Sequence, residues 1–247
     1  MCCFTGKVQQ VSGTSIFARV PSPGRQLLAY AMSVTAPAGV AMVLPLPTPR
    51  DTSARDIGFI DLSHYPEFFP RCEAAYATRD AATRGGPEAG GAGKVLEVVR
   101  VGAFEASFAP RREDLARLDA TLSVPDGFLA GLPQYADHGF VVFRLVPGDH
   151  RYHPLAFSFP STAAGLYFPT VHVHDGEVHP RAVFDHRLFC QRGGGDLRLA
   201  DWEESPGLAG LIVDVDEARG LVDGQGHLYR MALSGELPNT DTWVAPA

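Results

Sequence analysis

The chain carries many short apolar runs in which large hydrophobic residues alternate with small or polar ones. Leu155, Phe157 and Phe159 alternate with Ala156 and Ser158, which is the period of a half-buried strand. Proline (20) and glycine (26) separate these runs. The ranges predicted as strands are Ser15–Arg19, Gln26–Thr35, Val40–Pro45, Lys94–Phe108, Gly139–Val146, Leu155–Phe159, Leu166–His174, Ala182–Cys190, Gly210–Val215 and Gly226–Leu233. Regularly spaced strands with turn signals between them are typical of a β-sandwich or a barrel.

Helical patterns are fewer. Residues 66–79 place apolar side chains at helical spacing on one face, and these are Phe68, Phe69, Cys72, Ala75 and Tyr76. Shorter helices are predicted over 111–118 and 126–132. Residues 79–94 lack apolar periodicity and are interpreted as a flexible Gly/Ala-rich loop. The prediction is a mainly β protein with few helices, folded as one domain over residues 1–247.

Charge narrows the classes of partner. The formal net charge is −7, and no run of Lys or Arg occurs, so binding to nucleic acid is not expected. No apolar run is long enough to span a membrane, and no signal peptide is recognisable. We therefore expect a cytoplasmic protein with reduced cysteines, which are Cys2, Cys3, Cys72 and Cys190.

The segment FPTVHVHDGEVHP holds a dense group of histidines. Asp175-Gly176 between two extended runs predicts a two-residue hairpin turn. In that hairpin His174 pairs with Glu177, and His172 lies opposite His179. Side chains two apart on a strand share a face, and opposed Cβ atoms are roughly 5 Å apart. The sequence therefore predicts that three imidazoles gather on one patch.

Imidazoles and thiolates together are typical ligands of copper or zinc, while His with Glu177 would also suit iron. The predicted metal ligands are His172, His174, His179, Cys2 and Cys3. An open coordination position would permit oxidation or hydrolysis of a small-molecule substrate. The first functional hypothesis is therefore a metal-dependent enzyme, either an oxidoreductase or a hydrolase. His150, His153 and His186 bring to six the histidines between positions 150 and 186, out of nine in the chain. His186 would need a bulge near Pro180 to join the patch.

Two alternatives remain open. Removal of Met1 would leave Cys2 at the terminus, where its own amine can act as the base for its thiol. Cys2, with a nearby His, would then be the nucleophile of a metal-free hydrolase or amidase. Glu177 is a further candidate catalytic residue. The other alternative is a non-catalytic β-rich binding protein, with no bound metal and no reactive thiol.

Two further segments carry isolated polar groups. Tyr135, Asp137 and His138 precede a strongly apolar strand, where polar groups often line a site. The plainer interpretation is a turn with an Asp cap. Glu105 stands alone in an apolar run and, if buried, would need a partner.

The sequence resembles two groups of proteins. His172-Val173-His174 followed by Glu177 is similar to the cupin metal motif, although Glu177 is closer than in cupins and no second motif follows. That similarity implies a metal site on a β scaffold. The opening MCCF, with AMVLPLPTP, LPQYADHGFVVF and FPTVHVHDGEVHP, resembles a family of bacterial proteins that begin with the same four residues. This second resemblance spans most of the length and implies no particular activity or catalytic residue.

Overall fold

The computed structural model describes residues 2–36, 39–77, 106–118, 124–125, 127, 129–145, 147–193 and 197–247. The fold is mainly β, which confirms the predicted class. Its strands are β1 (Cys2–Phe4), β2 (Gln10–Ser22), β3 (Arg25–Ala36), β4 (Val40–Leu46), β5 (Gly58–Asp61), β6 (Ala106–Ala109), β7 (Gly139–Leu145), β8 (Gly148–Arg151), β9 (Leu155–Pro160), β10 (Leu166–Phe168), β11 (His172–Val173), β12 (Arg181–Cys190), β13 (Glu203–Leu208), β14 (His227–Pro238) and β15 (Thr242–Val244). The helical elements are α1 (Phe68–Ala74) and the 3₁₀ turns η1 (Ala54–Asp56), η2 (Arg112–Arg117), η4 (Pro133–Tyr135) and η5 (Ala209–Leu211).

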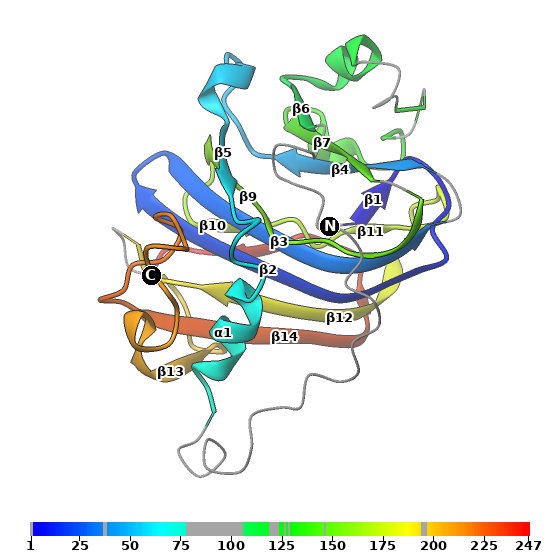
Figure 1. The fold of residues 1–247 in the computed structure, drawn as a ribbon. Helices are drawn as coiled ribbons and strands as arrows, with labels where there is room; N and C mark the ends of the chain where they lie inside the picture. The colour runs from blue at the N-terminus through cyan, green and yellow to red at the C-terminus, as the bar shows by residue number, and fades with distance from the viewer. Residues whose placement is uncertain are drawn as a thin grey trace.

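Two sheets make the body of the molecule (Figure 1). The smaller has the order β11-β1-β4-β7-β6, and the larger has the order β13-β14-β12-β2-β3-β9-β5, with β8 also paired to β3. The main apolar core lies between them and includes Val43 and Phe143 from one sheet and Leu28 and Phe157 from the other. Burial of large side chains from both facing sheets is what holds such layers together.

A second apolar cluster covers part of the outer face of the larger sheet. There α1 packs its buried Phe68, Phe69 and Cys72 against Phe17 and Phe189 of the strands. The helical face predicted from residues 66–79 is therefore correct, although α1 is shorter than the predicted range. Figure 1 shows α1 in front of β2, β12 and β14.

Several predicted elements differ from the structure. Residues 210–215 form η5 and a turn, because Gly210 donates to the Gly224 carbonyl and Val213 donates to that of Ala209. The 111–118 helix is the 3₁₀ turn η2, and the 166–174 strand is divided into β10 and β11. The 79–94 loop, Glu105 and most of the Lys94–Phe108 strand lie outside the described residues, as does part of the 126–132 helix.

The predicted hairpin at Asp175-Gly176 is wrong. β11 pairs with β1 in the smaller sheet, whereas β12 pairs with β2 and β14 in the larger one. The turn itself exists, with Gly176 at φ 91° and the Asp175 carboxylate accepting from the Glu177 N–H. It does not close a ladder, because the strands on its two sides pair in different sheets. The turn instead carries the chain from one sheet to the other.

Candidate functional site

The site is built around β11 and the strand beside it. β1 and β11 run parallel, with Cys2 and Cys3 as the Cα partners of His172 and Val173. The other edge of β11 is closed by the side chain of Asn239. Its carbonyl accepts from the His172 N–H at 2.7 Å, and its amide donates to the His172 carbonyl at 2.9 Å. This pair of bonds reproduces the pairing that a neighbouring strand would supply.

Three imidazoles come together here, and we call His172, His174 and His186 the imidazole cluster. The Nε2 atoms of His172 and His186 are 2.8 Å apart, so one ring donates to the other. The rings of His172 and His174 are stacked at 4.8 Å between centroids. Phe184 packs on His172 at 4.4 Å and closes the apolar side of the cluster. The cluster therefore spans the space between the two sheets.

The third member is His186 of β12, in place of the predicted His179. The alternation of burial along β12 puts Phe184, His186 and Leu188 on its buried face. That alternation is visible in the sequence, but the assumption of a hairpin directed attention to His179 instead. His179 is exposed, and its Nε2 is 2.8 Å from an Asp175 carboxylate oxygen.

Burial keeps the imidazole cluster uncharged. Desolvation lowers the pKa of His172 to about 3, that of His174 to about 4 and that of His186 to about 2. The imidazoles also disfavour charge on one another, because like charges repel. All three are neutral at neutral pH. His179 shows the opposite shift, because its hydrogen bond to Asp175 raises its pKa.

The metal-dependent oxidoreductase predicted from the sequence is corrected by this geometry. Within the described ranges, no three His, Cys, Asp or Glu side chains are placed to hold one metal ion. Two nitrogens on one tetrahedral zinc, each about 2.0–2.1 Å from it, would be roughly 3.3 Å apart. The 2.8 Å separation of His172 and His186 is shorter and fits a direct hydrogen bond. Glu177, the other predicted catalytic group, is exposed in the turn.

The remaining thiols are buried. Cys3, Cys72 and Cys190 are enclosed in apolar surroundings. Burial raises the pKa of both Cys72 and Cys190, which holds these thiols in the unreactive protonated form.

A hollow of about 270 Å³ opens next to the imidazole cluster. Its lining includes His172, His174, His179, Arg181 and Val183.

A second polar centre, which sequence reasoning did not find, surrounds Asp241. One carboxylate oxygen accepts from the hydroxyls of Tyr135 at 2.6 Å and Tyr167 at 3.0 Å. The other oxygen accepts from the backbone of Thr170 and Val171, just before β11. Burial and the adjacent Asp241 raise the pKa of both tyrosines. This arrangement locks the segment that leads into β11.

Of the polar group predicted before β7, two members lie at this centre. Tyr135 binds Asp241, and the His138 ring packs between Tyr135 and Tyr167. Burial lowers the pKa of His138. Asp137 is exposed and pairs with Arg50.

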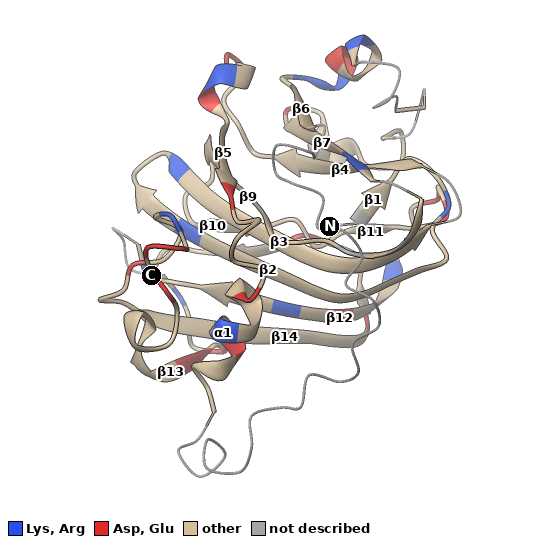
Figure 2. Cartoon of the chain, viewed as in Figure 1, with Lys and Arg blue, Asp and Glu red and all other residues tan. Residues whose placement is uncertain are grey.

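Figure 2 shows basic and acidic positions interspersed along the drawn ribbon, without a long run of one sign.

No family model matches the sequence, and no curated protein matches it. Several solved structures share its fold. Baculovirus P35 matches with a TM-score of 0.55 and 10% identity, over 99% of each chain. A mutated baculovirus P35 after caspase cleavage matches with a TM-score of 0.52 and 11% identity, over 95% of this chain and 99% of that one. The caspase-8/P35 complex structure matches with a TM-score of 0.51 and 10% identity, over 95% of this chain and 96% of that one.

No helix in the described part of the chain is long and apolar enough to cross a membrane.

Proposed function

We propose that this chain is a non-catalytic protein-binding protein whose partner is a cysteine protease of the caspase type. The observation that carries the proposal is the likeness to P35 over nearly the whole of both chains. Solved structures of that fold include a complex with caspase-8 and a form after caspase cleavage.

The chemistry of the described residues supports binding over catalysis. The imidazole cluster is neutral and engaged in ring-to-ring contacts, so it offers no general base poised near neutral pH. Cys72 and Cys190 are buried with raised pKa values. The two sheets and α1 form a packed scaffold on which a binding surface can be rigid.

The test is to add the purified chain to caspase-8 and follow hydrolysis of a fluorogenic peptide. We expect loss of protease activity at micromolar or lower concentration of the chain, with a complex visible by size-exclusion chromatography. Mass spectrometry then shows whether the chain is cut. A serine protease of similar size serves as the control and should keep its activity. No inhibition and no complex across a panel of caspase-type proteases would overturn the proposal.

One observation favours a second candidate function, that of a thiol enzyme using Cys2. The Cα atoms of Cys2 and His172 are register partners on the parallel strands β1 and β11, so a histidine stands beside this cysteine in the ladder. The test is alkylation of Cys2 by iodoacetamide in the wild type and in His172→Phe. A tenfold slower reaction in the variant supports this candidate. Equal rates, equal to that of free cysteine, dismiss it.

A further inference from the structure

The outer edge of β5 has no strand partner among the residues that the structure describes. β5 is the terminal strand of the larger sheet and pairs with β9 on one side only, from Gly58↔Ser158 to Asp61↔Leu155. On the other side its backbone forms no hydrogen bond with the part of the chain that the structure describes. An open edge of this kind presents N–H and C=O groups to any extended chain that approaches.

Two other strands in the described part of the chain have an edge that a side chain closes. Asn239 closes β11, and Gln26 closes β10 by binding both the N–H and the carbonyl of Tyr167. At the opposite margin of the larger sheet, β13 carries Pro206 and a register shift between Glu204 and Leu208. Proline, bulges and covering side chains are the usual protection against strand addition. β5, with the sequence Gly-Phe-Ile-Asp, has no proline and no register shift in its pairing with β9.

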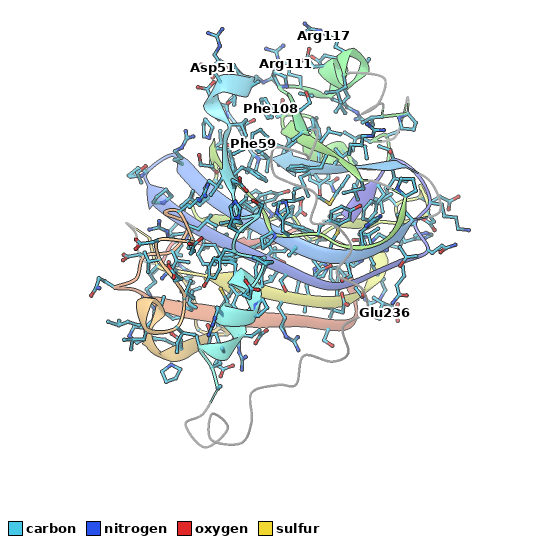
Figure 3. The ribbon with its side chains drawn as sticks, viewed as in Figure 1. Asp51, Phe59, Phe108, Arg111, Arg117 and Glu236 are labelled. Carbon is cyan, nitrogen blue, oxygen red and sulfur yellow. The ribbon has the colours of Figure 1, made fainter. Side chains whose placement is uncertain are left out.

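The open edge also presents an aromatic side chain. Phe59 lies in the middle of β5 with 43% of its surface exposed. Its ring packs edge-on against Phe143 of the smaller sheet and Phe157 of β9, each at 6.2 Å between centroids. Figure 3 labels Phe59 near Phe108, with Asp51 and Arg111 above them. Phe59 therefore caps one open end of the interior between the sheets.

The short length of β5 favours a single extended segment over a second copy of this chain as the molecule that binds its edge. Four residues of strand span roughly 13 Å, so pairing β5 with β5 of a second copy would bury far less than the ~1,200 Å² of a stable interface. A single extended segment needs only main-chain bonds and one or two side-chain contacts. Arg55 is exposed in η1, just before β5, and forms no ion pair with the described residues. Its guanidinium can therefore form an ion pair with an acidic side chain of the bound segment.

We propose that the outer edge of β5 binds an extended segment of a partner protein, which adds to the larger sheet as a further strand. An apolar side chain of that segment covers Phe59, and an acidic one faces Arg55. The surface is separate from the imidazole cluster, and the proposal holds whether or not the partner is a protease.

The probe is a phage-displayed library of random dodecapeptides, selected on the purified protein, followed by synthesis of the strongest binders. We expect peptides that alternate apolar and polar residues and include Asp or Glu. Fluorescence anisotropy should show at least tenfold weaker binding to Phe59→Lys. Val183→Lys is the matched control, since Val183 is 74% exposed on β12, and its affinity should be unchanged.

Strand addition makes a second requirement that does not depend on mutating the protein. One set of peptides carries N-methyl groups at the odd positions and the other set at the even positions. Only alternate N–H groups of an added strand face β5, so one set should lose binding and the other should keep it. Equal effects of the two sets, or equal binding to Phe59→Lys and wild type, overturn the proposal. So does a concentration-dependent dimer that Phe59→Lys dissociates, which would assign the edge to a second copy.

Discussion

Three side-chain amides each bind both backbone groups of one distant residue. Gln26 binds the N–H and carbonyl of Tyr167, Asn239 binds those of His172, and Gln191 binds those of Asp223. All three side chains are buried. An amide has one donor and one acceptor in the same relation as a peptide unit, so it can replace the neighbour that a short strand lacks.

Loss of one such amide should be costly. Gln26 is fully buried, and Gln26→Ala leaves the N–H and carbonyl of Tyr167 without partners. Each unsatisfied buried group costs about 1–3 kcal/mol, so we expect a loss of about 2–5 kcal/mol in the free energy of unfolding. Urea denaturation measures it. The control is Gln10→Ala, an exposed glutamine of β2, and equal losses in the two variants would contradict the prediction.

The imidazole cluster predicts acid sensitivity. The pKa values of His172, His174 and His186 are lowered in the folded state, whereas in the unfolded chain they are near 6.5. As pH falls below about 6.5 the unfolded chain binds protons first. The stability that the imidazole cluster contributes is therefore fully present above that pH and is lost progressively toward pH 4. Each group adds up to about 1.4 kcal/mol per pH unit to this loss. His179 acts in the opposite direction, because its pKa is raised.

The measurement is the free energy of unfolding at several pH values between about 7.5 and 4.5. His186→Leu should show a shallower dependence than the wild type, whatever its absolute stability. His64→Gln, which replaces an exposed histidine, should keep the wild-type slope. A slope unchanged by His186→Leu would show that the cluster is not the origin of the acid sensitivity.

At the scale of elements, β1 is short but central. It lies between β4 and β11, and Phe4 is fully buried beside the His174 ring. Phe4→Ala should cost about 3–5 kcal/mol, the usual range for a buried phenylalanine. Phe59→Ala, at a half-exposed position, should cost less than half as much. Thermal or urea unfolding compares them, and similar losses would mean that β1 contributes little to the core.

The distribution of cysteines among elements predicts thiol reactivity. Cys3 in β1, Cys72 in α1 and Cys190 in β12 are buried, so a thiol reagent should leave them unmodified in the native protein. All four cysteines should react in urea. Any fast reaction in the native state should disappear in Cys2→Ser. Peptide mapping by mass spectrometry that finds native labelling at Cys72 or Cys190 would refute this assignment.

The sequence largely predicted which segments form strands, but it did not predict which strands pair with one another. Alternation along 155–159 and 182–190 located β9 and β12 because local burial sets that pattern. The hairpin failed because β11 takes its neighbours from residues 2–4 and from Asn239, both remote in sequence. β13 and β15 were missed because their residues, EESPGL and TWV, show no clean alternation.

At the scale of the whole molecule, the same limit explains the site. Grouping of histidines in the sequence correctly placed His172 and His174 together. The sequence alone could not show that His186 enters across the interface between the sheets, close enough to His172 for a hydrogen bond. Nor could it show that Asp241, near the last strand, ties Tyr135 and Tyr167 to the approach to β11.

The parallel pairing of β1 with β11 has a consequence for synthesis. Residues 2–4 leave the ribosome long before residue 172, yet one strand that neighbours β1 contains His172, and Asn239 closes the far edge of that strand. β1 can pair early with β4, but it cannot gain its second neighbour, β11, until most of the chain has emerged. Such late contacts make folding slow and expose apolar strands in the meantime. Nascent chains stalled before residue 227 should remain protease-sensitive at residues 2–46. Full-length chains released from the ribosome should become resistant, and early resistance would show that β1 finds another partner first.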